Sequence, residues 1–178
     1  MTRIGTLVGA AVLLFALASF AQDVAPINPL VRRSSSNIVV QTSAMNCTTT
    51  LGQGAFDALS WSFGATEVTD PSSGLAGKAM VEALNVSKDW DECSPVLFGD
   101  TVAGTIFKSV TLTQSDKKGN VLLTVKLTNA LLTSFQIGGA RSDTRPVENL
   151  SFDFEKICIQ ETNGGAIACF NKGASSGQ

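Results

Sequence analysis

Two residue types are missing from the sequence, and both absences limit its chemistry. Its 178 residues include no histidine and no tyrosine. Without histidine, the chain cannot form Ser–His or Cys–His nucleophilic pairs, imidazole metal sites or histidine pH switches. Its aromatic residues, 10 phenylalanines and 2 tryptophans, offer few platforms for stacking bases or sugars. A facing pair of carboxylates is the hydrolytic arrangement that stays open, and otherwise we expect the protein not to be an enzyme.

Charge is also scarce. Charged residues make up 16% of the chain, and 13 basic residues nearly balance 15 acidic ones. The sequence therefore lacks the basic surface that attracts nucleic acids or anionic membranes. By contrast, 44% of the residues are hydrophobic and the mean hydropathy is +0.21, values unlike those of a disordered chain. We expect one folded domain with no cofactor and no nucleic-acid partner.

The first 21 residues have the composition of a secretory signal peptide. Arg3 gives a positive start, residues 4–20 form an apolar run, and Ser19-Phe20-Ala21 gives a small-x-small ending. We expect cleavage between Ala21 and Gln22, and export of the mature protein to the periplasm or the extracellular space, with no stable membrane insertion afterwards. A retained anchor is the alternative, because the apolar run approaches the ~18 residues needed to span a bilayer.

Composition divides the rest of the chain into three parts. Residues 22–37 contain two prolines, an arginine pair and three serines, as in a flexible linker. Residues 38–172 are the expected folded domain, and residues 173–178 are an expected disordered tail. Within the domain, short segments alternate apolar and polar residues between glycine and Asx turns, which is typical of an antiparallel β-sandwich or barrel. These segments are 38–40, 55–63, 79–86, 106–113, 121–128 and 150–155.

Finer features of the pattern predict faces and turns. In 106–113, the alternation places Ile106 with Val110 and Leu112 on one face, opposite Phe107. Residues 116–120 have the composition of a hairpin loop, and Asn163-Gly164 that of a two-residue hairpin turn.

One helix interrupts the strands. Ser94 is a suitable N-cap, Pro95 suits the first helical position, and Gly104 can end the helix. Three acids precede it, at Asp89, Asp91 and Glu92. They suggest a calcium cluster, but the glycine turn and spacing of an EF-hand loop are absent. We interpret them instead as charges that complement the helix dipole, and predict no metal site.

The four cysteines are an even set in a chain predicted to be exported, which favours two disulfides over buried free thiols. A turn at Asn163-Gly164 sets Cys158 opposite Cys169, as a hydrogen-bonded pair with Cα atoms ~5.5 Å apart. That separation permits a disulfide. Cys47 and Cys93 are the remaining two and either pair with each other or stay free.

Four segments form an ordered pattern of their own: FDALSWSFG at 56–64, DECSPVLF at 91–98, LTNALLTS at 127–134 and ENLSFDFEKI at 148–157. Together and in this order, they resemble the Hcp (haemolysin-coregulated protein) family, the tube protein of type VI secretion systems. The resemblance extends from about residue 56 to residue 170. It implies a mainly β fold, a small antiparallel β-barrel or two-sheet sandwich with one short flanking α-helix.

The resemblance also implies a function. Six copies of the family's protein form a ring, rings stack into a tube, and the tube carries effector cargo beneath a VgrG-like spike and inside a sheath. The role is structural, and it brings no catalytic residues to this sequence. In this chain, Ile38-Val39-Val40 and Ile167-Ala168 are candidate strand edges for pairing between copies, because neither contains Pro or Lys. The loop from Glu67 to Gly77 is the candidate for ring stacking.

A signal peptide, a linker and four cysteines are unusual for a tube subunit that assembles in the cytoplasm. The alternative function is therefore a secreted, monomeric binding module on the same fold, unrelated to type VI secretion. An exposed apolar patch would indicate it. Trp61 and Trp90 are the largest side chains that could form such a patch, although Trp61 has the strand position of a core residue.

We predict that the exported protein begins at Gln22, because the small residues Ser19 and Ala21 are placed for signal peptidase. N-terminal sequencing of protein recovered outside the cytoplasm measures this directly. Intact Met1 in the membrane fraction would show instead that the segment is kept as an anchor.

Overall fold

The computed structural model describes residues 37–67, 79–161 and 165–173. Several predicted features lie outside these residues: the signal peptide, nearly all of the linker and the tail, the Asn163-Gly164 turn, and the loop after Glu67. Within them, no helix is long and apolar enough to cross a membrane.

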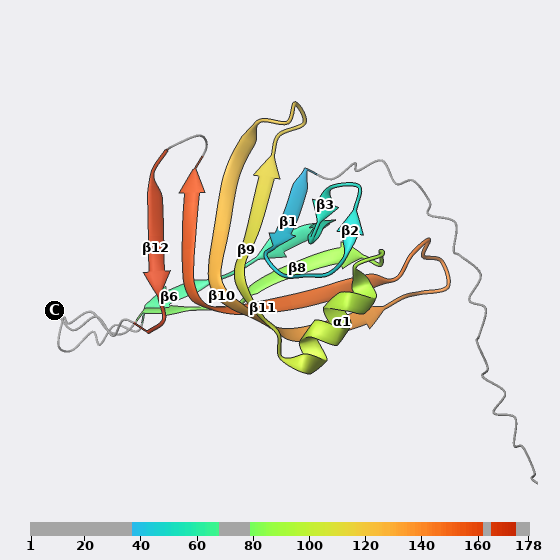
Figure 1. Ribbon diagram of the computed structural model, residues 1–178. Coiled ribbons are helices and arrows are strands. Elements are labelled where there is room, and N and C mark those ends of the chain that lie inside the picture. Colours follow the sequence, from blue (N-terminus) through green and yellow to red (C-terminus); the bar gives the residue numbers. More distant parts are fainter. Residues whose placement is uncertain (1–36, 68–78, 162–164, 174–178) are drawn as a thin grey trace, which may run out of the picture. The chain divides into compact units, whose positions relative to one another are not determined.

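Over the described residues the fold is mainly β and contains one helix, as the sequence predicted. The main sheet is antiparallel, curled, and ordered β4-β1-β9-β10-β11-β8-β5, with β12 paired to β11 (Figure 1). Its strands are β1 (Ile38–Thr42), β4 (Ala55–Asp57), β5 (Ser60–Ser62), β8 (Leu84–Asp89), β9 (Ile106–Ser115), β10 (Val121–Gly138), β11 (Val147–Glu161) and β12 (Ile167–Asn171). Two small ladders join β2 (Thr48–Thr49) to β3 (Gly52–Gln53), and β6 (Ala65–Glu67) to β7 (Ala79–Val81).

The first and last strands in this order are consecutive pieces of one segment. Residues 55–63, predicted as a single strand, divide into β4 and β5 around Ala58-Leu59. The Ala58 N–H donates to the Ile38 carbonyl at 2.9 Å, and the Leu59 N–H donates to the Ser87 carbonyl at 2.7 Å. One short segment therefore hydrogen-bonds to both ends of the sheet and keeps it curled.

The strand β1 is not an edge, which corrects the prediction for Ile38-Val39-Val40. It lies between β4 and β9 and pairs with both. The physical reason is the break at Ala58-Leu59, which frees β4 to cover the side of β1 that local sequence alone leaves open. Ile38 and Val40 are accordingly buried in the core.

In β9, β10 and β11, every second residue faces the core, and this alternation is shifted by one residue at the same level of the sheet. The buried residues step from Phe107 to Val110 in β9, from Leu127 to Ala130 in β10, and from Phe154 to Ile157 in β11. Each step is three residues long, and the steps are aligned because Leu127 pairs with both Val110 and Ile157. Figure 1 shows these strands bending along their length.

The aligned steps keep the core continuous around the bend. If the side chains alternated strictly along each whole strand, the apolar side chains beyond the bend would point away from the core. The prediction that Ile106 shares a face with Val110 is therefore wrong: Ile106 is 64% exposed, and Phe107 is fully buried. At the step in β10, Asn129 has a φ of +48° and donates to Glu155 Oε2 at 2.6 Å.

The helix α1 (Ser94–Ala103) begins one residue earlier than predicted. Cys93 is its N-cap, and Ser94 is the first helical residue. The Ser94 hydroxyl instead accepts from the Asp91 N–H at 2.9 Å and from Lys88 Nζ at 3.0 Å, outside the helix. Gly104 ends the helix in the left-handed conformation, with φ +66°, as its lack of a side chain allows.

The β9–β10 hairpin loop is confirmed. Asp116 accepts hydrogen bonds from the Lys118 N–H at 2.7 Å and the Asn120 N–H at 2.9 Å. The side-chain amide of Asn120 also donates to Asp116, and these bonds hold the pKa of that carboxyl below its ordinary value.

Substituting Asn129 tests the bend. Asn129→Val and Asn129→Gly both lose the bond to Glu155, but only valine is strained at a positive φ, by about 1–2 kcal/mol. We expect the valine variant to unfold at lower urea concentration than the glycine variant. Equal midpoints would contradict a left-handed residue at this step.

Candidate assembly interface

The strand β12 forms an open edge of the main sheet. In the part of the chain that the structure describes, it pairs with β11 and with no other strand. The Glu161 N–H donates to the Ala166 carbonyl, and the Lys172 N–H to the Glu155 carbonyl. Because neighbouring residues of an antiparallel strand face opposite sides, the backbone groups of Ile167, Cys169 and Asn171 point away from β11.

Nothing in β12 guards this edge. The strand contains no proline and no charged residue, the usual devices that prevent edge pairing. Its side chains are mostly exposed, Ile167 by 61%, while Phe170 is half-buried and packs against the core. The structure therefore places the predicted Ile167-Ala168 segment on an edge that is open to another strand.

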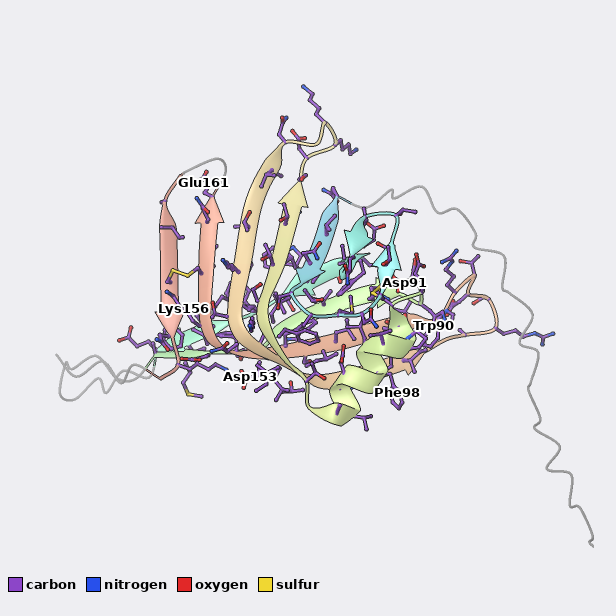
Figure 2. The ribbon with its side chains drawn as sticks, viewed as in Figure 1. Trp90, Asp91, Phe98, Asp153, Lys156 and Glu161 are labelled. Atoms are coloured by element: carbon purple, nitrogen blue, oxygen red, sulfur yellow. A yellow bond between two sulfur atoms is a disulfide. The ribbon has the colours of Figure 1, made fainter. Side chains whose placement is uncertain are left out.

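Lys172, directly after β12, holds the end of this strand against β11. Its ammonium group pairs with the Asp153 carboxylate and lies 4.5 Å from the centre of the Phe154 ring. Partial burial acts to raise the pKa of Asp153, but hydrogen bonds from Lys172 and the Phe154 N–H, with the Lys172 charge, outweigh it and lower that pKa. Figure 2 shows Asp153 and Lys156 on the same strand, β11, with Glu161 at the strand's far end.

The strands β11 and β12 have the register that the sequence predicted, with Ile159 opposite Ala168 and Cys158 opposite Cys169. The type of pair differs from the prediction. Because Glu161 and Ala166 are hydrogen-bonded, Cys158 and Cys169 form a non-hydrogen-bonded pair, and their Cα atoms are 4.1 Å apart. A disulfide joins the two side chains in the structure.

A second disulfide joins Cys47 to Cys93, whose Cα atoms are 5.4 Å apart. It connects the segment before β2 to the N-cap of α1. Cys93 is fully buried and belongs to the core.

The outer face of α1 is a second candidate contact surface. Phe98 is 55% exposed and Val102 is 73% exposed, one helical turn apart. The Phe98 ring packs edge-on against Phe135 of β10, with 5.7 Å between ring centres. Figure 2 shows Phe98 on the helix and Trp90 before its start.

The two tryptophans contribute less than the sequence suggested. Trp61 is half-buried, stacks with Phe63, and donates its indole N–H to Gln114 Oε1 at 2.9 Å. Trp90 is 37% exposed, and its backbone N–H donates to the Pro146 carbonyl. Sequence reasoning missed Phe98 and Val102, although their four-residue spacing within the predicted helix was the available signal.

A buried ion pair lies where β8 meets the helix, and sequence reasoning missed it. Lys88 Nζ is 3.0 Å from Glu148 Oε2, and both side chains are fully buried. The Lys88 ammonium also lies 2.9 Å from Asp91 Oδ1 and 5.5 Å from the centre of the Phe56 ring. Lys88 and Glu148 are direct cross-strand partners in β8 and β11. The available sequence signal was the alternation along the strand, because Lys88 continues the inward-facing series of Leu84 and Val86.

This cluster accounts for one of the acids before the helix. The Asp91 carboxylate accepts the Cys93 N–H at 2.9 Å as well as pairing with Lys88. Within the described ranges, no three acidic or cysteine side chains are grouped so that they could hold a metal ion. The arrangement supports structure around the helix start rather than proton transfer to a substrate, because Lys88 and Glu148 are sealed from solvent.

Comparison with known proteins points to one family. The sequence profile of a family described as "Type VI secretion system effector, Hcp" matches residues 46–160. Among curated proteins, no sequence matches the chain.

Solved structures share the fold. A type VI secretion system effector from Yersinia pestis is 20% identical, with a TM-score of 0.61 over 75% of this chain and 98% of that one. Hcp1 from Salmonella typhimurium is 16% identical, with a TM-score of 0.62 over 75% of this chain and 93% of that one. An Hcp1 variant from E. coli EAEC 042 is 15% identical, with a TM-score of 0.65 over 77% of this chain and 99% of that one.

Removing one partner of the buried ion pair should strongly destabilise the domain. Lys88→Met leaves a buried, unpaired carboxylate at Glu148, and we expect a loss of about 3–5 kcal/mol in the free energy of unfolding. The double variant Lys88→Met/Glu148→Met should regain much of this loss. Urea unfolding under oxidising conditions measures both, with Lys126→Met as an exposed control. A single variant as stable as that control would contradict the buried pair.

Proposed function

Because the chain belongs to the Hcp family of type VI secretion proteins, we propose that it is a non-catalytic structural subunit that assembles with copies of itself into closed rings. The family match covers more than half of the sequence, including the whole of β8, α1, β9 and β10. Membership brings a structural role, and the sealed Lys88–Glu148 pair and the missing histidine agree with that role.

The observation that carries the proposal is the unguarded edge of β12. A strand with one paired side and exposed backbone groups is a template for another chain. If β12 of each copy pairs with a different strand of the next copy, the contact between copies is head-to-tail. Repeating such a contact around an axis produces a closed ring. The β6–β7 ladder, whose side chains are mostly exposed, is a second place where a neighbour can pair.

The finer details of the proposal follow the family. The ring contains six copies, rings stack into a tube, and a VgrG-like spike, a sheath and effector cargo are its partners. The predicted signal peptide and the disulfides favour assembly in the periplasm or outside the cell, because disulfides persist in oxidising compartments. Rings that work with a type VI secretion apparatus and rings that work without one both fit this location.

A monomeric, secreted binding module is the second candidate function. The exposed Phe98 and Val102 on α1 favour it, because an exposed apolar face marks a contact site. This candidate requires no contact between copies through β12.

The ring proposal predicts a native mass above that of one chain. We expect native mass spectrometry of residues 22–178, under oxidising conditions, to find a closed oligomer, most simply of six copies. Ile167→Pro should shift it toward monomer, because proline removes an N–H that points away from β11. Ile167→Thr is the matched control, since threonine keeps this N–H and suits a strand.

A wild-type monomer at micromolar concentration, without rings in negative-stain micrographs, would refute the ring and favour the binding module. An oligomer that tolerates Ile167→Pro would show that copies meet elsewhere than at β12.

A further inference from the structure

The strand β12 is attached to the domain at few points. Its ladder with β11 pairs residues 156–160 with residues 167–171. Among its side chains, Phe170 packs against the core, while Ile167, Ala168, Cys169 and Asn171 are exposed. Beyond the ladder, the fastenings are the Lys172–Asp153 ion pair and the Cys158–Cys169 disulfide. A strand with so little buried apolar surface opens readily when a covalent link is removed.

The two disulfides differ in their exposure to solvent. Cys93 is fully buried, so the Cys47–Cys93 bond lies against the core. Cys169 is exposed and Cys158 half-exposed, on a strand at the edge of the sheet. Since thiol–disulfide exchange requires a thiolate to reach a sulfur atom in line, the Cys158–Cys169 bond is the one open to an enzyme.

We propose that Cys158 and Cys169 are a modification site for a thiol–disulfide oxidoreductase, and that their oxidation locks β12 in place as the edge used for assembly. This inference rests on the proposed function, because it assigns a control to the same edge. It makes ring formation depend on the redox state of the compartment.

The chemistry balances without a cofactor on this chain. One cysteine thiolate attacks the disulfide of a dithiol oxidase, forms a mixed disulfide, and releases one thiolate of the oxidase. The second cysteine thiolate then attacks the mixed disulfide and releases the other. The two cysteines lose two electrons and two protons, and the oxidase gains them as a dithiol. A reduced dithiol protein drives the reverse reaction.

The two redox states present different edges. In the oxidised chain, the open backbone groups belong to Ile167, Cys169 and Asn171 of β12. In the reduced chain, release of β12 uncovers the groups of Ile157 and Ile159 on β11, which β12 covers in the ladder. The second edge lies one strand closer to the core, so a neighbour shaped for β12 no longer fits it.

Hydrogen exchange tests the lock directly. The mature chain, purified without reductant, is compared with the same chain after reduction by a dithiol and with Cys158→Ser/Cys169→Ser. We expect the amides of Ala168 and Phe170 to exchange at least ~10-fold faster in both altered forms, while amides of β9 and β10 keep their protection and show that the domain is folded. Cys47→Ser/Cys93→Ser is the matched control and should leave exchange in β12 unchanged.

Thiol alkylation and native mass complete the test. Under limiting dithiol, peptide mapping should find Cys158 and Cys169 alkylated before Cys47 and Cys93. Rings should be lost in Cys158→Ser/Cys169→Ser and kept in the control. Unchanged protection of β12 after reduction, or reduction of Cys47–Cys93 first, would overturn the lock.

The two proposals fail in different ways. If oxidised wild type is monomeric, the ring is refuted, and exchange at Ala168 and Phe170 still decides whether the disulfide locks β12. If rings form equally in both redox states, the ring stands and the control by oxidation is refuted.

Discussion

The requirement that one core stay continuous around a bend organises this domain. Three neighbouring strands bend together, and each resets its alternation there, between Phe107 and Val110 in β9 and at matching positions in β10 and β11. A reset in one strand alone would break its pairing with both neighbours, because register and facing direction are tied in a sheet. Because the shifts are aligned, the same strands run through both arms of the curled sheet, which are its parts before and after the bend. In β11, β8 pairs with one arm and β12 pairs with the other.

The buried Lys88–Glu148 pair has a different kind of influence. A one-residue slip between β8 and β11 would break this pairing of buried charges, and a buried charge without its partner is strongly destabilising. The same ammonium group contacts Asp91 and Ser94, so the register of two strands also sets where α1 begins. The helix then carries its apolar Phe98 face outward, where packing on β10 covers only part of it.

Sequence reasoning succeeded where the determining signals are local. The loop at Asp116 and the register that sets Cys158 opposite Cys169 follow from turn chemistry and counting. It failed at Ile106, because a reset of alternation depends on three strands bending together. It also failed at Ile38-Val39-Val40, because whether an edge is covered depends on a partner from elsewhere in the chain. Lys88 and Glu148 were missed because each lies just beyond a predicted strand, and their charge argued against burial.

The length of the β10–β11 ladder has a mechanical consequence. It joins residues from Leu123 to Gly138 with residues from Val147 to Glu161 without a gap larger than one bulge. Its hydrogen bonds run across the strands, so a pull along the axis of either arm loads the bonds of that arm in shear together instead of opening them one after another. Force delivered along the Cys158 arm is thereby shared among the hydrogen bonds of that arm.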